Sequence, residues 1–343
     1  MTAEATALSG PRFPVARLRG PLILLLVILA SYAVIAFGAG EQAPAQFINA
    51  VTIGALYALI ALGYTMVYGI IELINFAHGE IFMCGSFVSW SVITTMGITG
   101  AITDIPRLVI VLVVVFLISM LVMGVVGVII ERFAYRRLRN APRLAPLITA
   151  IGVSFILQNI ISVGISNSVV TIPQLIPNTK LDFGVFSISV INVFVIALAL
   201  ALMVELHLFI TQTRLGTAMR STAMDREAAQ LMGVNINTTI AITFFIGSAL
   251  AGAAGVVQGL YIGVTVFNIG FNYGLKAFTA AVLGGIGNTT GAVLGGFVIG
   301  FLEVISQVYG YANWSEAVVF GALVAVLIFR PTGILGQQLA DRA

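Results

Sequence analysis

The chain has 343 residues, of which 59% are hydrophobic and only 8% are charged. Soluble domains carry about 25% charged residues, so this composition excludes an ordinary soluble protein and indicates one embedded in a lipid bilayer. The single cysteine, Cys84, lies in an apolar run and excludes both a disulfide within the chain and a cysteine-rich metal site. The net charge of +3 decides little by itself, and the positions of the charges along the chain carry more information.

The first apolar run, residues 21–40, follows Arg12, Arg17 and Arg19. A cleaved signal peptide is the alternative here, because AFGAG at the end of the run has the small residues of a cleavage site. Signal-peptide cores have about 7–15 apolar residues, whereas this run approaches the roughly 20 residues that a spanning helix needs. We therefore expect a retained first helix, preceded by a cytoplasmic tail formed by residues 1–20.

Further apolar runs follow in chain order, separated by short polar segments. Residues 273–283 and 316–329 are short for a full crossing, and a re-entrant segment is possible where protein or water covers the backbone. The expected fold is all-α and polytopic, with about ten membrane segments (eight to ten). The runs are residues 21–40, 47–71, 79–96, 108–130, 147–165, 187–210, 238–263, 273–283, 292–309 and 316–329.

Positively charged residues are concentrated on one side of this topology. If every run crosses and the N-terminus is inside, only Arg107, Lys180 and Lys276 of the 16 cationic residues lie outside. Short loops on the cytoplasmic side retain lysine and arginine, so this bias predicts that both ends of the chain are cytoplasmic. The cationic residues on the inner side are Arg12, Arg17, Arg19, Arg132, Arg136, Arg137, Arg139, Arg143, Arg214, Arg220, Arg226, Arg330 and Arg342.

Small residues recur at every fourth position in the later runs. Lipid gives helices no hydrophobic reason to associate, so they pack through faces of small residues that let two backbones approach closely. We therefore expect the last four segments to form a tightly packed unit rather than separate helices surrounded by lipid. The series are Gly247, Ala251, Gly255, Gly259 and Gly263, then Gly287, Gly291 and Gly295, then Gly296 and Gly300.

Several catalytic motifs are absent from the sequence. Neither Lys180 nor Lys276 belongs to a GxxxxGK[ST] phosphate loop, so the chain lacks this machinery for nucleotide hydrolysis. His78 and His207 do not form HExxH, and Ser154 lies in GVSF rather than in GxSxG. The sequence therefore favours a conduit through the membrane, whose energy source, if it has one, lies on another chain.

The longest cytoplasmic segment, residues 211–237, contains a predicted short helix in DREAAQLM. Asp225 and Glu227 stand near its start, where acidic groups suit the positive end of the helix dipole, and Gly233 marks its end. We expect a surface helix whose apolar patch of Ala228, Leu231 and Met232 is able to enter a groove of a partner. The alternative is a solvated connecting helix.

This segment resembles a known family. EAAQLMG, residues 227–233, is similar to the loop that permeases of ABC importers dock onto their ATPase subunits, although the Leu-Pro expected after Ile242 is missing. Residues 49–87 and 274–300 resemble branched-chain amino acid ABC permeases more widely. The compact length and the NFAHGE sequence resemble the H-type permease subunit rather than its longer M-type partner.

The resemblance implies a permease domain over residues 21–330 and a cytoplasmic tail at 331–343, in a bacterial plasma (inner) membrane. The implied partners are a second, M-type permease subunit, two ATP-binding cassette subunits and a periplasmic or lipid-anchored binding protein. ATP and Mg²⁺ then bind on the ATPase subunits, and this chain is a transport subunit without a cofactor or catalytic residues of its own. The implied docking residues are Arg220, Asp225, Glu227, Ala228, Ala229 and Gly233.

Polar residues within the apolar runs are candidates for a translocation path or gate, since such residues face protein or water. Asn75–Glu80 falls at the predicted cytoplasmic turn between the second and third segments, where His78 and Glu80 would reach water and Asn75 and Gly79 would suit a tight reversal. A plain cap or interhelical hydrogen bonding is the alternative for these groups. Glu303 would attract a substrate ammonium or pair with Lys276. The candidates are Asn75, His78, Glu80, Gln158, Asn159 and Glu303.

Three functions stay compatible with these observations. The resemblance favours ATP-driven import of branched-chain or related apolar amino acids, and a urea or short-chain amide permease is the near alternative. A secondary transporter or channel, with Asn75–Glu80 as a broken helix around an ion site, is the alternative from another class. That reading predicts activity without an ATPase. Whether the pore is formed by two identical or two different chains is open.

Overall fold

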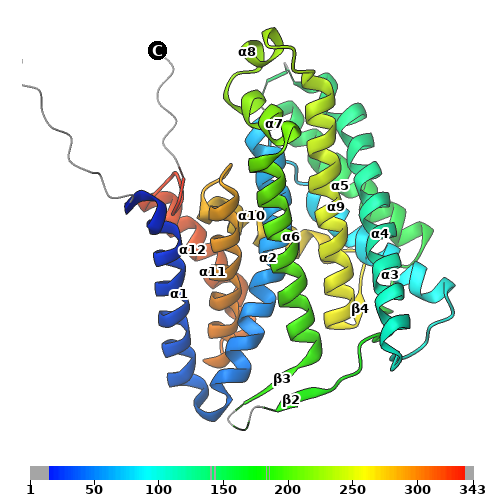
Figure 1. Cartoon of the computed structure of the whole chain (residues 1–343), viewed down its shortest axis with the longest axis vertical. Helices are drawn as coiled ribbons and strands as arrows, with labels where there is room; N and C mark the ends of the chain where they lie inside the picture. Colours follow the sequence, from blue (N-terminus) through cyan, green and yellow to red (C-terminus); the bar gives the residue numbers. More distant parts are fainter. Residues whose placement is uncertain (1–14, 140, 143, 183, 185, 337–343) are drawn as a thin grey trace, which may run out of the picture.

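The computed structural model describes residues 15–139, 141–142, 144–182, 184 and 186–336. The chain forms a bundle of long helices that run roughly along the long axis of the molecule (Figure 1). Helices are expected here because a chain in hydrocarbon must satisfy its backbone polar groups internally. The helices are α1 (Val15–Ala39), α2 (Ala43–Ile71), α3 (His78–Thr95), α4 (Ile105–Ile130), α5 (Leu144–Gly164), α6 (Val190–Gln212), α7 (Arg214–Met224), α8 (Arg226–Leu231), α9 (Ile236–Ile262), α10 (Ile269–Gly284), α11 (Thr289–Val308) and α12 (Ser315–Phe329).

Short elements complete the described part of the chain. A 3-10 turn η1 (Gly40–Gln42) joins α1 to α2, a π-helical turn η2 (Glu131–Tyr135) and a 3-10 turn η3 (Arg136–Leu138) follow α4, and η4 (Ala312–Trp314) precedes α12. The antiparallel strand pairs are β1 (Val170–Thr171) with β4 (Val264–Thr265), and β2 (Lys180–Asp182) with β3 (Ser187–Ser189).

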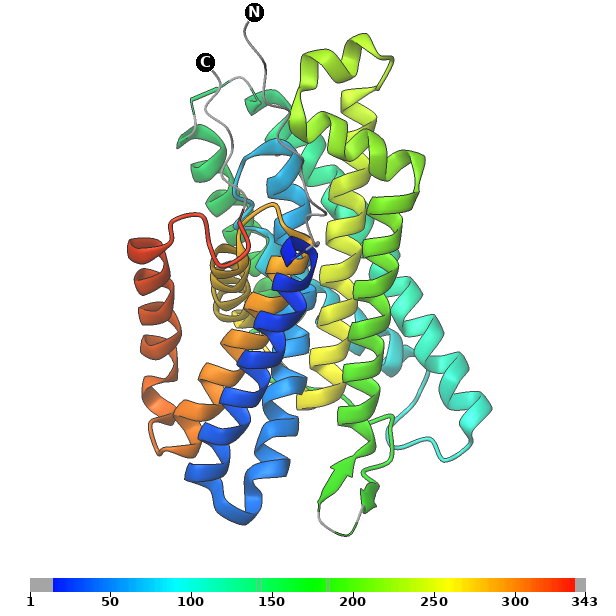
Figure 2. The ribbon, with the colours of Figure 1, turned by 60° about the vertical axis from the view of Figure 1, so that its left-hand side comes forward.

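The all-α, polytopic prediction is confirmed. Each predicted apolar run corresponds to a helix of the described chain, and α7 and α8 come from the segment 211–237. Seven stretches are long and apolar enough to cross a membrane, and the first joins α1 and α2, which lie side by side in both views (Figure 2). Neither α3 nor α10 is among the seven, so ten full crossings stay a prediction.

The beginning of the first helix differs from the prediction. We expected a tail over residues 1–20, but α1 begins at Val15, so the apolar run is extended backwards by a helical turn and more. The rest of this predicted tail, residues 1–14, lies outside the described residues, as do residues 337–343 of the predicted tail 331–343. The described start of α1 and the end of α12 both point toward the end of the molecule that carries α7 and α8 (Figures 1 and 2).

Small residues bring α9, α10 and α11 into close contact with their neighbours, as predicted. A Cβ atom added at Gly255 would lie 2.6 Å from the backbone nitrogen of Ser86 in α3, and one added at Gly300 would lie 2.5 Å from the Cα of Gly54 in α2. Such distances leave room only for hydrogen, so the backbones of these helices touch directly.

The prediction that the last four segments form one tightly packed unit is wrong for α12. Within the protein, 78% of the apolar stretch of α9 and 61% of that of α11 are buried, against 11% of that of α12. Large side chains such as Ile328 and Phe329 are exposed on α12, and a Cβ atom added at Gly321 would meet nothing within 4 Å. Ala317, Gly321 and Ala325 of α12 also recur at every fourth position, but they are exposed, so no helix of the described chain packs against this face.

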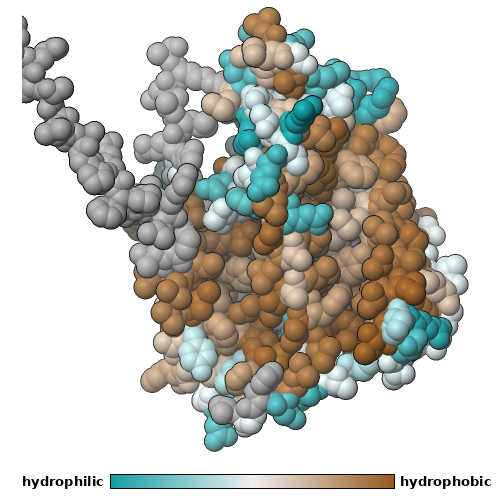
Figure 3. Space-filling model, in the orientation of Figure 1, coloured by the Kyte–Doolittle hydropathy of each residue, from teal (hydrophilic) through white to brown (hydrophobic). Residues whose placement is uncertain are grey.

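The surface has the pattern of a protein surrounded by lipid. In the face shown in Figure 3, apolar residues cover most of the middle of the molecule. Hydrophilic residues gather around α7 and α8, and again in patches at the opposite end, where β2 and β3 lie (Figures 1 and 3). An apolar band between two polar ends is what a bilayer requires of a multi-pass protein.

Candidate functional site

The segment between α2 and α3 folds back into the protein. Glu72, directly after α2, takes a left-handed conformation with φ 54°, and α3 begins at His78. The imidazole of His78 lies directly against Gly63 of α2. Gly63 precedes the last residue of α2 by eight positions, so at 1.5 Å per residue His78 lies about 12 Å below the end of that helix.

This arrangement corrects the predicted environment of the motif. We expected His78 and Glu80 to reach water at a surface turn, but their exposed fractions are 0% and 1%, and that of Asn75 is 2%. Of the left-handed or capping geometry predicted for Asn75 and Gly79, the left-handed conformation is found at Glu72 instead, whereas the Asn75 carbonyl accepts a hydrogen bond from the His78 N–H at 3.1 Å in a tight turn before α3. The segment leaves the surface after Glu72 and inserts between α2 and α10, which cover it.

Gly79 is small because α3 and α10 approach each other there. A Cβ atom added at Gly79 would lie 2.9 Å from the Cα of Gly274 and still closer to the carbonyl oxygen of Gly270. Both residues belong to the first half of α10, so the first turns of α3 and α10 lie side by side inside the protein. The contact itself is buried at Gly79, Gly270 and Gly274, whereas Phe271 on the other side of the first turn of α10 is exposed.

The polar side chains of the motif have different surroundings. The Tyr135 hydroxyl donates to Asn75 Oδ1 at 2.9 Å. Neither ring nitrogen of His78 has a hydrogen-bond partner, and the ring packs edge-on against Tyr64 with centroids 4.6 Å apart. Of the two carboxylate oxygens of Glu80, Oε1 is hydrogen-bonded, whereas Oε2 is buried without a partner beside Gly270.

Glu80 links α3 to α5. Gln158 Nε2 donates to Glu80 Oε1 at 2.7 Å, and the Ser154 hydroxyl donates to the same oxygen at 3.2 Å. The structure thus brings together Glu80 and Gln158, which the sequence proposed separately, and adds Ser154. Asn159 lies elsewhere, because its amide donates to the carbonyl of Phe155 on the exposed side of α5.

A cavity of 290 Å³ lies next to this cluster. It is bounded by α5, by the first turns of α10 and by the segment before α3, and its walls are mainly apolar. Ser154, Gln158 and Gly270, the neighbours of the Glu80 carboxylate, are all part of the wall. The other lining residues are Tyr64, Phe76, Ile151, Phe155, Phe271, Gly274 and Leu275.

Glu303 lies outside this cluster and is held by two donors. The Lys276 ammonium donates to Glu303 Oε1 at 3.0 Å, and the Tyr57 hydroxyl donates to Glu303 Oε2 at 2.6 Å. The pairing with Lys276, one of the two predicted alternatives, is confirmed. Lys276, which the predicted topology counted among the cationic residues on the outer side, is not in an exposed loop: it lies within α10 with an exposed fraction of 8%.

The segment 211–237 forms two helices at one end of the molecule. The predicted short helix is confirmed as α8: Asp225 precedes it, and its side chain accepts hydrogen bonds from the backbone N–H groups of Glu227 and Ala228. Gly233 follows in a left-handed conformation with φ 86°. No feature of the sequence separately indicated α7, which lies between α6 and α8.

The exposed tip of α8 is apolar. Leu231 and Met232 have exposed fractions of 89% and 85%, and Ala228 is also exposed. Ala229 is buried against the rest of the protein with an exposed fraction of 4%. This tip lies at the polar end of the molecule, where large exposed apolar side chains are typical of a surface that contacts another protein.

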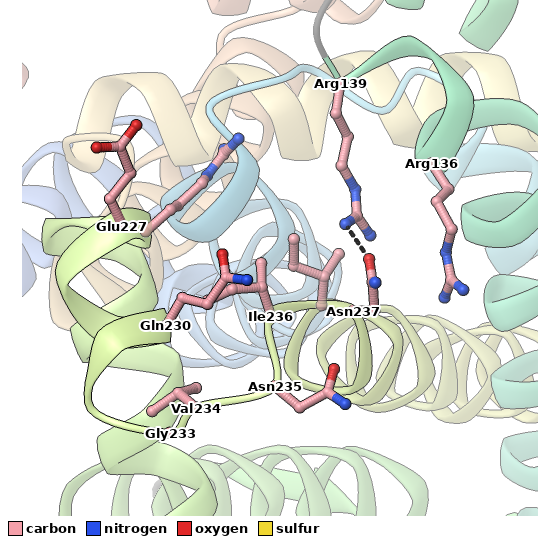
Figure 4. A pocket seen from close by; sticks show the side chains of 11 residues that line it. Arg136, Arg139, Glu227, Gln230, Gly233, Val234, Asn235, Ile236 and Asn237 are labelled. Atoms are coloured by element: carbon pink, nitrogen blue, oxygen red, sulfur yellow. Dashed lines mark hydrogen bonds between the residues drawn. The ribbon is translucent and has the colours of Figure 1, made fainter.

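Arginine residues line a basin of 620 Å³ beside α8 (Figure 4). Arg136 and Arg139, which follow η2, form ion pairs with the fully buried Glu131, and Arg139 donates to Asn237 Oδ1 at 2.7 Å. Arg226, the first residue of α8, is also part of the lining. The sequence did not identify Arg226 as a neighbour of Arg136 and Arg139, since it lies about 90 residues farther along the chain and shares no motif with them.

Arg226 connects α8 to the end of α2. Its Nη2 donates to the carbonyls of Ile70 and Ile71, at 3.2 and 3.0 Å. These carbonyls belong to the last turn of α2, and the last carbonyl oxygens of a helix have no hydrogen-bond donors within the helix. Arg220, a predicted docking residue, donates instead to the carbonyl of Ile210 near the end of α6, so its guanidinium braces α7 on its own chain.

Replacement of Arg226 by glutamine is expected to loosen the segment after α2. Charge-assisted hydrogen bonds contribute about 1.5–3 kcal/mol, so amide exchange over residues 72–77 should be at least about tenfold faster in the variant. Hydrogen–deuterium exchange read by mass spectrometry measures this rate. Arg214→Gln, at the exposed start of α7, is the matched control and should leave the rate unchanged. Equal rates in both variants would contradict the connection.

Comparison with known proteins identifies the family. Residues 46–327 match the family model described as "Branched-chain amino acid transport system / permease component". The chain belongs to this family. No solved structure matches it.

This permease component aligns with curated relatives over nearly their whole length. The high-affinity branched-chain amino acid transport system permease protein BraD of Pseudomonas aeruginosa is 45% identical over 303 residues, which are 87% of this chain and 97% of BraD. The corresponding protein LivH of Escherichia coli strain K12 is 42% identical over 87% of this chain and 96% of LivH. A probable branched-chain amino acid transport permease protein of Methanocaldococcus jannaschii is 28% identical over 84% of this chain and 91% of its own.

Membership gives the two polar features of this permease component a context. The buried cluster around Glu80 adjoins a cavity among the membrane helices, and the tip of α8 projects from one polar end. A transport subunit needs a route for its solute and a surface for the partner that drives it. The buried polar cluster with its cavity suits the first task, and the exposed apolar tip suits the second.

Proposed function

We propose that this chain is a membrane-spanning permease subunit of an ATP-driven importer and that it carries branched-chain amino acids into a bacterial cell. The names of its relatives support this substrate class, because BraD and LivH are branched-chain amino acid permeases that align over nearly their full length. The partners would be a second permease subunit, two ATPase subunits that bind ATP and Mg²⁺, and a binding protein outside. The subunit would lie in the plasma membrane, with both ends of the chain in the cytoplasm.

The arm formed by α7 and α8 carries the proposal. It lies at one of the two polar ends of the molecule and presents Leu231 and Met232 almost fully exposed beside an arginine-lined basin. An amphipathic helix with exposed apolar residues docks into an apolar groove, and cationic side chains at the rim attract acidic groups of the partner. Arg226 would transmit a movement of the docked arm to the end of α2.

The predicted docking residues divide into two groups in this proposal. Glu227 and Ala228 lie exposed on α8 with the apolar tip and would contact the ATPase. The other group would position α8: Asp225 caps its start, Gly233 ends it and Ala229 packs against the rest of the protein.

Co-purification with the ATPase subunits tests the docking proposal. Leu231→Glu is expected to reduce the ATPase recovered with the tagged permease by at least about tenfold, because central apolar contacts contribute about 2 kcal/mol or more to an interface. Leu181→Glu introduces the same change at an exposed position of β2, at the opposite end, and should leave recovery unchanged. Undiminished recovery and undiminished leucine-stimulated ATP hydrolysis with Leu231→Glu would rule out docking by this tip.

The alternatives make different demands on the interior. A secondary transporter built around paired intramembrane carboxylates would need Glu80 and Glu303 together, but Glu303 is bound by Lys276 and Tyr57 away from Glu80. That class also predicts leucine uptake by vesicles that contain the permeases alone. We expect uptake only with ATPase subunits, ATP and the binding protein present. A urea or amide permease has no need for a charged group beside an apolar cavity.

A further inference from the structure

We propose that Glu80, the first turn of α10 and the 290 Å³ cavity beside them form a binding site for a zwitterionic, apolar α-amino acid within the membrane. In this site Glu80 holds the ammonium group, the free N–H groups at the start of α10 hold the carboxylate, and the apolar wall accepts the side chain. The inference rests on the proposed function and assigns a substrate site to it.

The unpaired oxygen of Glu80 points to a cationic ligand. The side chain is 1% exposed, Oε1 accepts hydrogen bonds from Ser154 and Gln158, and Oε2 has no partner. Among the described residues, the ion pairs involve Glu131 and Glu303, not Glu80. A buried carboxylate without a cation is costly in a low-dielectric interior, so an ammonium group placed at Oε2 would be strongly favoured.

The start of α10 supplies the complementary charge. The 16-residue helix α10 begins at Ile269, and the side chain of Asn268, which precedes it, makes no capping hydrogen bond. The Ile269 N–H donates to the carbonyl of Val266 at 3.1 Å, so the N–H groups of Gly270 and Phe271 are the ones left for a ligand. The first N–H groups of a helix have no partners within the helix, and together with the helix dipole they attract a carboxylate. Gly270 and Phe271, in this turn, both line the cavity.

The two charged elements are adjacent. Oε2 of Glu80 is so close to Gly270 that it would clash with a Cβ atom at this position. The ammonium and carboxylate groups of an α-amino acid are attached to the same carbon, so one molecule can satisfy both elements at once. A solute with only one of these groups, or with neither, would leave a buried charged or polar group without a partner.

The remaining wall fits a small aliphatic side chain. Phe76, Phe155, Phe271, Ile151 and Leu275 line the cavity. Pockets for drug-sized ligands have volumes of about 300–1,000 Å³, so a 290 Å³ cavity suits a smaller solute. A branched aliphatic side chain placed among these residues would be removed from water, which favours its binding.

Uptake of radiolabelled leucine by the complete transporter in proteoliposomes tests the site. Glu80→Gln keeps the size of the side chain and removes its charge, and we expect uptake per assembled complex to fall by at least about tenfold, because loss of one member of a buried charge pair is strongly unfavourable. Glu41→Gln makes the same change at an exposed carboxylate of η1, away from this segment, and should leave uptake unchanged. Wild-type uptake by Glu80→Gln would overturn the site but not the proposed function, whereas absence of leucine uptake by the wild-type transporter would overturn both.

A labelling experiment covers the case in which Glu80→Gln assembles poorly. Ile151→Cys is introduced into a Cys84→Ala background, which removes the buried native thiol, and its reaction with a small maleimide is followed in membranes. Leucine should slow the labelling, and 4-methyl-2-oxopentanoate, which has the same carbon skeleton but no ammonium group, should not. Adding Glu80→Gln should abolish the protection by leucine. Equal protection by leucine and the keto acid would overturn the assignment of Glu80 to the ammonium.

Discussion

Glutamine in place of Glu303 is expected to lower the free energy of unfolding by about 3 kcal/mol, because it leaves a buried cation without its anion. Both carboxylate oxygens are used in the native protein, one by Lys276 in α10 and the other by Tyr57 in α2. An amide can accept only one of these two hydrogen bonds. Urea-induced unfolding in detergent micelles, followed by circular dichroism, measures the change.

The double variant Glu303→Gln with Lys276→Met separates the charge from the hydrogen bond. With the ammonium gone, the amide oxygen can still accept the hydrogen bond from Tyr57, and methionine fills the space of the lysine stem. We expect the double variant to be more stable than Glu303→Gln alone, as the non-additivity of contacting residues requires. Equal instability of the two variants would show that the carboxylate contributes through something other than Lys276.

The same variant decides between the two predicted roles of Glu303. If Glu303 joins α2, α10 and α11, the folded fraction of Glu303→Gln should import leucine at a rate close to that of the wild type. Loss of uptake without loss of stability would instead place Glu303 on the translocation path. The geometry favours the first outcome, because both oxygens already have partners within the protein.

Much of the fold follows from patterns that act locally. Long apolar runs predicted the positions of the membrane helices, because hydrocarbon leaves a backbone few other solutions. Small residues at every fourth position predicted the close packing of α9 and α11. Asp225 and Gly233 marked the two ends of α8. In each case the physical cause lies within a few residues of the effect.

The misplaced features depend on contacts between distant parts of the chain. Asn75–Glu80 has the composition of a surface turn, and its insertion is decided by room left at Gly63 in α2 and at Gly270 in α10. No local signal distinguishes these two outcomes. The same reason explains why Lys276 looked like an external charge: its burial is possible only because Glu303, 27 positions later, lies opposite it.

The contacts also suggest how the two polar features communicate. Arg226 in α8 holds the end of α2, the chain reverses at Glu72, and the buried segment leads directly into the turn that carries Glu80. Only the short segment 72–77 separates the two helices. A displacement of the α7–α8 arm would thus reach Glu80 through one covalently continuous route, without passing through the lipid-facing helices.

Alanine in place of Gly79 is expected to destabilise the protein by about 1–3 kcal/mol, because one added methyl group would push two helix backbones apart. The new Cβ atom would meet the carbonyl oxygen of Gly270 and lie 2.9 Å from the Cα of Gly274. Backbone atoms cannot rotate away as a flexible side chain does, so α3 must shift relative to α10. Thermal unfolding in detergent measures the loss of stability.

Gly321→Ala adds the same methyl group where it meets nothing within 4 Å, on the exposed helix α12. Because alanine favours a helix over glycine by up to about 1 kcal/mol, this control should leave the melting temperature unchanged or raise it. Opposite signs for the two substitutions would show that contact, rather than helix propensity, determines the effect at Gly79. Because Glu80 is the next residue, the shift should also widen the gap between its carboxylate and Gly270 and lower leucine uptake by the folded fraction. A Gly79→Ala protein with native stability would mean that α3 and α10 separate without cost, and the pairing of Glu80 with the start of α10 would then lose its structural basis.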